Sequence, residues 1–278
     1  MDFAAQDIVN YLCASAGAIP ADRPGIYLAE QDETELIEKL WTGTETAEEL
    51  VVAEDVRENT PALFLQDEKE RYAFSVDINN NLQRHRFDKN LDEWMKDNLE
   101  GEQPILIHGM SRLSGGIVDG THFVFFENLD GQLQAVRISH KGECQQLPPT
   151  PVQSQQGRPH SALVTGDGLV HLFYVHQEDN SIHHFTTQLD VILPGTDFDD
   201  VQIVNFLVIP HEDLTFDMFA LLSSGRLVVV DKIGTKTLLG QVKDGQFTAA
   251  SSEECVIEAA AMVKKGIKAA SGIKSKGK

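Results

Sequence analysis

Residues Arg71–Phe87 read RYAFSVDINNNLQRHRF, in which two runs of alternating apolar and polar residues flank an Asn-rich segment. Alternation with a period of two is typical of β-strands that bury one face. Asp and Asn bond to their own backbone and tolerate positive φ, as tight turns require. The stretch therefore predicts a β-hairpin, and Leu169–Phe185 (LVHLFYVHQEDNSIHHF) repeats its pattern.

The same kind of strand pair occurs five times along the chain. A short polar turn separates the two strands of each pair. The five pairs are Ile26–Glu30 with Leu36–Trp41, Tyr72–Asp77 with Leu82–Asp88, Thr121–Glu127 with Gln132–Ile138, Leu169–Val175 with Ser181–Thr187, and Asp217–Ser223 with Arg226–Lys232.

The first apolar residue after each turn marks a repeat. These residues are Leu36, Leu82, Leu133, Ile182 and Leu227, so the intervals are 46, 51, 49 and 45 residues. Intervals of this length match a four-stranded propeller blade. A β-sandwich is the alternative, but a sandwich does not require near-constant spacing. We therefore expect an all-β fold, a β-propeller of four-stranded blades. Five hairpins predict five blades, and a sixth assembled from the two termini is the alternative.

Segments on either side of the hairpins supply the remaining strands. Apolar segments before the last four hairpins predict innermost strands at Pro61–Gln66, Pro104–His108, His160–Val164 and Val204–Ile209. Polar segments after the hairpins, such as Glu93–Leu99 and Asp199–Ile203, predict exposed outer strands.

The propeller is expected to span residues 24–250. Residues 1–23 would form an N-terminal segment or closing strand, with a helical pattern at Phe3–Ala14, and residues 251–278 a C-terminal helix (around Glu254–Ala270) and Lys-rich tail. Met262–Lys278 holds six lysines and no acidic residue. It is either a contact arm for an acidic partner or a solvated end.

The charge balance excludes some partners. The chain carries 23 Lys+Arg against 43 Asp+Glu, a net charge of −20 at pH 7. A surface this negative repels phosphate backbones and anionic lipid, so we expect neither a nucleic-acid nor a membrane partner. No apolar run approaches the ~18 residues of a membrane span.

Cysteine usage and the first residues indicate the compartment. Met1–Pro20 lacks the basic region and uninterrupted apolar stretch of a signal peptide. Cys13, Cys144 and Cys255 are widely separated and form no CxxC pair, which predicts buried free thiols in a reducing compartment. We expect a cytoplasmic protein.

No motif indicates a metal or an organic cofactor. There is no HExxH, no GxSxG and no phosphate-binding loop. His183 and His184 are adjacent, so in a strand they point to opposite faces and cannot share one ion. Asp77 to Asp88 imitates a calcium loop but has Leu82 where the sixth position needs glycine. We expect no metal and no cofactor.

The quoted hairpins resemble blades of the fungal fucose-specific lectins, over about residues 24–245. That family's sugar site has an Arg at the start of the second strand, a Glu in the third, and a nearby aromatic, often Trp. The resemblance puts Arg71, His122 and His171 at Arg-like positions. Glu-like positions hold Glu38 in the first hairpin but Arg84, Ala135, His184 and Val229 in the others, and the tryptophans are Trp41 and Trp94. No single blade carries the full set.

A lectin-like scaffold without complete sugar sites also resembles the propeller hetero-Diels–Alderases of fungal tropolone sesquiterpenoid biosynthesis. That resemblance implies an intracellular protein that binds a non-carbohydrate small molecule and catalyses a cofactor-free cyclisation. The expected catalytic residues are Arg71, His122, His171 and His184, with Trp94, His108 and His160 as ligand-binding residues.

Two other functions remain open. The chain could be a fucose-type lectin with degenerate sites, if Arg71 and Trp94 belong to one surviving pocket. It could also be a protein-interaction propeller, for which the acidic surface and the Lys-rich tail would be the evidence. The oligomeric state is not predicted.

Overall fold

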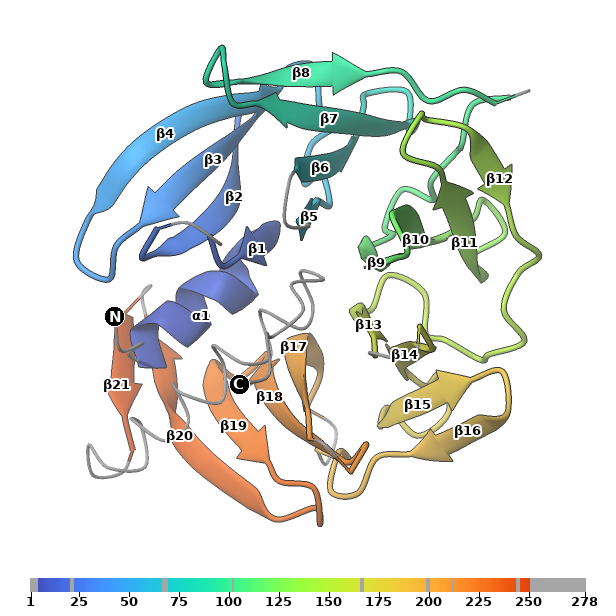
Figure 1. Cartoon of the computed structure of the whole chain (residues 1–278). Helices are drawn as coiled ribbons and strands as arrows, with labels where there is room; N and C mark the ends of the chain where they lie inside the picture. Colours follow the sequence, from blue (N-terminus) through green and yellow to red (C-terminus); the bar gives the residue numbers. More distant parts are fainter. Residues whose placement is uncertain are drawn as a thin grey trace.

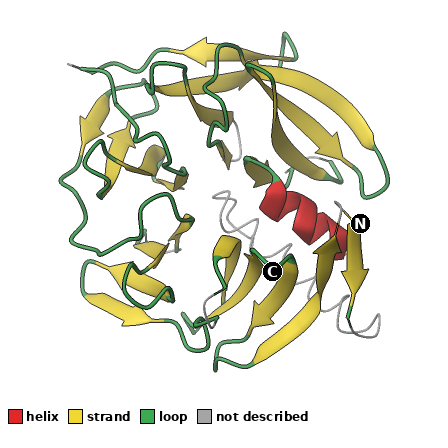
Figure 2. Cartoon of the chain, turned by 180° about the vertical axis from the view of Figure 1, so that it is seen from behind, coloured by secondary structure: helices red, strands yellow, loops and turns green. Residues whose placement is uncertain are grey.

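The computed structural model describes residues 5–250, except 21–22, 67–69, 102, 166–167, 199–200, 212 and 244–245. Five antiparallel sheets stand around a central axis like the blades of a propeller, with one short helix near the N-terminus (Figure 1). The same ring is seen from behind in Figure 2. The fold is thus an all-β, five-bladed propeller, as the repeat predicts.

Each blade is built from consecutive strands, the first lying nearest the axis. Blade 1 contains β1 (Ala16–Ala18), β2 (Ile26–Asp32), β3 (Glu35–Trp41) and β4 (Thr46–Ala53), and blade 2 contains β5 (Leu63–Gln66), β6 (Arg71–Val76), β7 (Leu82–Asp88) and β8 (Glu93–Asp97). Blade 3 contains β9 (Ser114–Val118), β10 (Thr121–Glu127), β11 (Leu133–Ile138) and β12 (Cys144–Gln146), and blade 4 contains β13 (His160–Val164), β14 (Val170–Val175), β15 (Ile182–Thr186) and β16 (Leu189–Ile192). Blade 5 has five strands, β17 (Ile203–Pro210), β18 (Phe216–Leu222), β19 (Arg226–Val230), β20 (Lys236–Lys243) and β21 (Gln246–Ala249).

The repeat residues occupy equivalent places at the start of the third strand of every blade. All five are less than 5% exposed: Leu36, Leu82, Leu133, Ile182 and Leu227. Each side chain stays in contact with the core while the preceding turn reverses the chain. The sequence pattern therefore predicted the hairpins correctly, because strand alternation and turn residues both act locally.

The helix α1 (Ala5–Cys13) completes the ring between blade 5 and blade 1 (Figure 1). Ile8, Val9 and Leu12 are at most 3% exposed and belong to a core that includes strands of both blades. Asp7 accepts a hydrogen bond from Trp41 Nε1 of blade 1 at 2.6 Å, and Asn205 of blade 5 donates to the Leu12 carbonyl at 2.8 Å. The predicted N-terminal helix is present, and it fills the space between two blades.

Several expectations need correction. The described residues form no sixth blade: β1 is the innermost strand of blade 1, and β21 is the outermost of blade 5. The innermost strand of blade 3 is Ser114–Val118 rather than Pro104–His108, and the outer strand of blade 4 is Leu189–Ile192 rather than Asp199–Ile203. Pro104–His108 is apolar because Ile105 and Ile107 pack into the core of blades 2 and 3.

The strand β9 escaped prediction because crowding selects glycine there. A Cβ on Gly115 would lie 2.2 Å from the Phe123 carbonyl oxygen, and one on Gly116 would lie 2.5 Å from a Val164 methyl. Strands that approach this closely need glycine, which weakens the strand pattern in the sequence.

The cysteines differ in part from the expectation. Cys13 and Cys144 are free thiols, but Cys13 is exposed and Cys144 is half-buried. Cys255, the expected C-terminal helix and the Lys-rich tail lie outside the described residues. In the described part of the chain, no helix has both the length and the apolar character that crossing a membrane requires.

Candidate functional site

The strand register identifies equivalent side chains at the interfaces between blades. In each blade the second-strand residue facing the repeat residue is fixed by pairing, for example Val76 with Leu82 and Glu127 with Leu133. Counting back five residues along the second strand gives equivalent positions in all five blades: Ile26, Arg71, His122, Val170 and Phe216. Val170, and not His171, is therefore equivalent to Arg71, because the blade 4 turn is one residue longer (His176 to Ser181, against Asp77 to Asn81).

The structure brings Arg71 of blade 2 against blade 1. Arg71 Nη2 lies 2.9 Å from Glu38 Oε1, which belongs to the third strand of blade 1. The guanidinium carbon lies 4.2 Å from the ring centroid of Tyr27, 3.9 Å from that of Phe87 and 5.2 Å from that of Trp94. We call these five residues the Arg71 cluster. It joins a cation, a carboxylate and three aromatic rings at the interface of blades 1 and 2.

Burial sets the electrostatics of the cluster. The side chains of Arg71 and Glu38 are 11% and 3% exposed, and Trp94 is 9% exposed. Burial raises the pKa of Glu38 to about 7, although the nearby Arg71 guanidinium and Trp94 indole oppose the rise. The buried Nε of Arg71 has no hydrogen-bond partner among the described residues. The cluster therefore offers hydrogen-bond donors and a titratable carboxylate in a weakly hydrated place.

Such a group can recognise neighbouring hydroxyls. A guanidinium donates in a fixed planar geometry and a carboxylate accepts, so together they can hold two adjacent O–H groups. Aromatic faces suit the apolar C–H face of a sugar ring.

A groove of about 680 Å³ lies next to the cluster. Residues Leu50–Val56 of β4 and the loop after it, residues of β8, and the β6–β7 turn line it. Trp94 belongs to both the groove and the Arg71 cluster, whereas Arg71 and Glu38 do not line the groove. Trp94 is therefore the residue of the Arg71 cluster that lines the groove.

His122 occupies the equivalent position at the interface of blades 2 and 3. It is 1% exposed, and its ring meets those of Tyr72 and Phe74 edge-on at centroid distances of 4.3 and 5.7 Å. Arg84 takes the Glu38 position there. Its fully buried side chain forms an ion pair with Asp97 at 2.8 Å and donates to the Ser139 carbonyl at 3.0 Å.

His171 and His184 do come together, as a buried pair at the interface of blades 4 and 5. His171 Nδ1 lies 2.8 Å from His184 Nε2, and the two rings stack at 5.0 Å. Phe173 and Phe216 lie 4.8 and 4.9 Å from the His184 ring. Burial, and next the neighbouring His171, lower the pKa of His184 to about 4.

His108 and His160 lie elsewhere. His160, 7% exposed, faces a central cavity of about 100 Å³ lined by the inner strands and α1, and burial lowers its pKa to about 4. Its Nδ1 lies 2.7 Å from Ser114 Oγ. His108 is in the loop before blade 3, where Gln156 Nε2 lies 2.8 Å from its Nε2.

The structure therefore distributes the expected site residues. Arg71 and Trp94 form one group and His171 and His184 another, while His122, His108 and His160 each lie apart. The lectin resemblance puts Glu38 at a Glu-like position, but Glu38 was not among the expected site residues, because its partner Arg71 belongs to the next blade. The Asp77 turn is an ordinary one: the Asp77 carboxylate accepts bonds from Asn79 and Asn81 backbone N–H groups and from the Asn81 and Gln83 side chains.

Comparisons with known proteins support the fold. The sequence matches no family model and no curated protein. Among solved structures, the chain is similar to an arginine-substituted mutant of AofleA from Arthrobotrys oligospora, with a TM-score of 0.64 and 12% identity over 84% of this chain and 74% of that one. It is similar to a mutant of the Aleuria aurantia lectin in complex with Fucα1-6GlcNAc (TM-score 0.58, 15% identity, 82% of this chain and 77% of that one). It is also similar to the SapL1 lectin in complex with α-methyl fucoside (TM-score 0.54, 11% identity, 84% and 80%).

The comparisons give no support to the Diels–Alderase resemblance. The Aleuria aurantia lectin is described as a six-bladed propeller, whereas this chain has five blades. The architecture resembles that of fungal fucose-binding lectins, and at these identities the likeness concerns the fold alone.

Proposed function

We propose that this protein is a carbohydrate-binding propeller of the fucose-lectin type that keeps one site, at the interface of blades 1 and 2. The observation that carries the proposal is the Arg71–Glu38 ion pair with Trp94 beside it. The sequence-based alternative was a lectin in which Arg71 and Trp94 belong to one surviving pocket, and their contact at 5.2 Å supports that alternative.

The geometry suggests how a sugar would bind. The faces of the Arg71 guanidinium are covered by Tyr27 and Phe87, and 11% of its side chain remains exposed. A ligand would therefore meet the edge of the guanidinium, where its N–H groups point, with Glu38 accepting from a neighbouring hydroxyl. Trp94 would present its ring toward the groove that it lines.

A cofactor-free cyclase has weaker support. Its expected catalytic residues, Arg71, His122, His171 and His184, lie at three different blade interfaces, and the three histidines are at most 6% exposed. General acid–base catalysis needs the acting group within hydrogen-bond reach of the reacting atoms. Sugar binding would need only the residues of the Arg71 cluster, which lie together at one interface.

A glycan array followed by titration with α-methyl fucoside tests the proposal. We expect binding, and we expect Arg71→Lys, which keeps the charge but loses the planar donor geometry, to weaken it by about tenfold or more. Arg137→Lys is the matched control, because Arg137 also lies over a ring, Phe123 at 5.9 Å, but is exposed. No binding to any glycan, or equal affinity for wild type and Arg71→Lys, would refute the proposal.

A further inference from the structure

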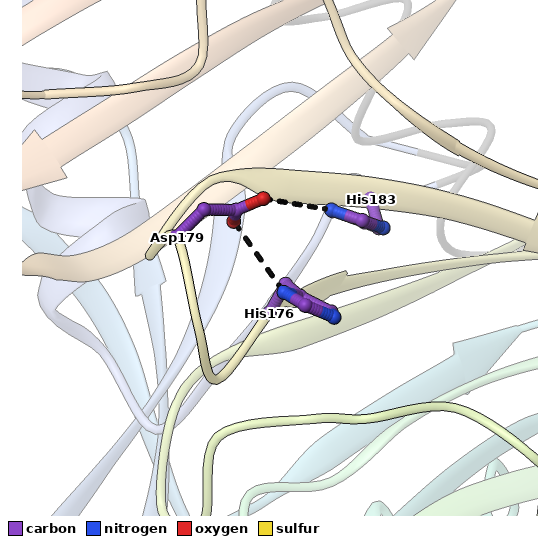
Figure 3. A group of neighbouring side chains, drawn as sticks. All are labelled: His176, Asp179 and His183. Atoms are coloured by element: carbon purple, nitrogen blue, oxygen red, sulfur yellow. Dashed lines mark hydrogen bonds and ion pairs between the residues drawn. The ribbon is translucent and has the colours of Figure 1, made fainter.

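Three side chains of metal-binding type meet at the β14–β15 turn of blade 4 (Figure 3). His176 follows the last residue of β14, Asp179 lies in the turn, and His183 is the second residue of β15. His183 Nε2 lies 3.4 Å from Asp179 Oδ2, and His176 Nδ1 lies 3.6 Å from Asp179 Oδ1. One ligand atom from each residue lies within 4.8 Å of the other two.

These distances are close to those around a bound ion. Two ligand atoms, each about 2.0–2.1 Å from a tetrahedral zinc ion, are separated by about 3.3 Å. The two N···O distances, 3.4 and 3.6 Å, are near that value, and each joins a histidine to a different oxygen of the Asp179 carboxylate. The rings of His176 and His183 stack with their centroids 4.3 Å apart, so binding one ion through both would require the two stacked rings to tilt apart.

His183 is also oriented by a carboxylate behind it. Its Nδ1 lies 3.3 Å from Asp190 Oδ1, and Asp190 in turn accepts hydrogen bonds from the Tyr174 hydroxyl at 2.9 and 3.0 Å. Metal-binding histidines usually donate their second N–H to a carboxylate, which fixes the tautomer and the ring orientation. A proton held on Nδ1 leaves the Nε2 lone pair directed at Asp179.

Asp179 and His176 are also held by hydrogen bonds from nearby residues. Ser181 donates to Asp179 Oδ1 from its backbone N at 2.9 Å and from its hydroxyl at 2.6 Å. These two bonds fix the orientation of the carboxylate beside the two imidazoles. The Glu178 backbone N–H lies 3.4 Å from His176 Nδ1, and a metal ion bound at this nitrogen would replace that contact.

We propose that His176 Nδ1, His183 Nε2 and the Asp179 carboxylate form a binding site for a divalent transition-metal ion of the zinc class. Two imidazoles and one carboxylate suit Zn²⁺, whereas Ca²⁺ and Mg²⁺ prefer oxygen ligands. Three protein ligands leave a further coordination position for water or for an oxygen atom of a bound molecule.

The site departs from the sequence expectation that the chain has no metal site. That expectation considered His183 with His184, which point to opposite faces. The turn instead places His183 beside His176, seven residues earlier. The site is separate from the proposed sugar site, because Arg71 begins the second strand of blade 2, whereas His176 follows the end of the second strand of blade 4.

Calorimetric titration of the untagged full chain with Zn²⁺ tests the proposal. We expect one equivalent to bind, and Co²⁺ at the same site to give the visible absorption of a four-coordinate ion. His176→Ala and Asp179→Ala should each weaken binding by more than about tenfold, and Asp190→Asn should weaken it by about tenfold while the stoichiometry stays at one.

His211→Ala is the matched control, because His211 also pairs with an aspartate, Asp217 at 2.8 Å, but belongs to no group of three metal-binding side chains among the described residues. This variant should bind Zn²⁺ as the wild type does. Thermal unfolding without metal establishes that each variant folds, and Zn²⁺ should raise the melting temperature of the wild type alone among wild type, His176→Ala and Asp179→Ala. No binding by the wild type, or unchanged binding by His176→Ala, would overturn the proposal.

Discussion

The interfaces between blades 1 and 2 and between blades 2 and 3 use the same three positions, but one of these positions holds a carboxylate in the first interface and a guanidinium in the second. The first holds Arg71 against Tyr27, with Glu38 beside them. The second holds His122 against Tyr72, with Arg84 at the place of Glu38. In both, the first position lies over the tyrosine of the preceding blade, so the scaffold is shared and only the chemistry differs.

At the interface of blades 2 and 3, the positions that form the candidate site elsewhere are part of the core. Arg84 has no exposed side-chain surface, and its charge is satisfied by Asp97 and the Ser139 carbonyl. A guanidinium has no acceptor for a hydroxyl, unlike the Glu38 carboxylate that holds this position at the first interface. At the interface of blades 4 and 5 the same positions carry Phe216, His171 and His184, which pack as rings. Only at the interface of blades 1 and 2 do the equivalent positions place a cation beside a carboxylate.

The largest expected effect is on stability at the interface of blades 2 and 3. Arg84→Ala removes a fully buried guanidinium and leaves Asp97 and the Ser139 carbonyl without it. Breaking this pair should lower the free energy of unfolding by about 3 kcal/mol, the low end of the range for buried pairs, because Asp97 is 29% exposed. Urea unfolding measures this, with exposed Arg137→Ala as the control, which should change stability by less than about 1 kcal/mol. Equal effects of both substitutions would show that Arg84 is not a core residue.

A second prediction concerns the pH dependence of the Glu38 position. The folded-state pKa of Glu38 is raised from 4.5 to about 7, so the folded protein holds this proton more tightly than the unfolded chain. Its contribution to stability is therefore lost as pH rises from 4.5 to 7. A shift of this size is worth about 3 kcal/mol. Relative to Glu38→Gln, the wild type should lose about that much stability across this range in urea unfolding. If the free energies of unfolding of wild type and Glu38→Gln changed equally with pH, the pKa of Glu38 would not be raised on folding.

The fold was predictable where its causes are local. Alternation, turn residues and the spacing from Leu36 to Leu227 identified all five hairpins and the blade count. Local pattern failed at β9, where Gly115 and Gly116 serve a close approach between strands. It also could not place α1 between blades 5 and 1, because that packing joins residues about two hundred positions apart, as in the bond from Asn205 to Leu12.

The candidate site was predictable only in part, for the same reason. The lectin resemblance identified Arg71, Glu38 and Trp94 as positions of interest. The sequence could not predict that they come together, because Glu38 and Arg71 belong to different sheets and meet only when the blades pack. His122 and His171 were expected to contact ligand because they stand at Arg-like positions of the lectin pattern, yet both pack against aromatic rings in the core.

A third prediction concerns the histidine pair at the interface of blades 4 and 5. The pKa of His184 is lowered from 6.5 to about 4 when the protein folds. Its contribution to stability is present above pH 6.5 and is lost as pH falls toward 4. His184→Phe keeps a planar ring next to Phe173 and should reduce the acid-induced loss of stability by about 2 kcal/mol. Chemical unfolding at pH 7 and pH 4 measures this, with His211→Phe as the control. A full acid-induced loss in His184→Phe would place the acid sensitivity in other groups.

The smallest expected effect is at His122, the residue that matches Arg71 in position but not in chemistry. His122 lies between Tyr72 and Phe74 and is 1% exposed, so a sugar cannot reach its ring while the interface stays packed. His122→Gln should therefore change the affinity for α-methyl fucoside by less than about twofold, which corresponds to about 0.4 kcal/mol. Arg71→Lys, measured in the same titration, should weaken binding by about tenfold or more. A loss of affinity in His122→Gln as large as that in Arg71→Lys, with an unchanged melting temperature, would mean that the interface of blades 2 and 3 also binds sugar. In that case, a buried Arg84 in place of Glu38 would not prevent the interface of blades 2 and 3 from binding sugar.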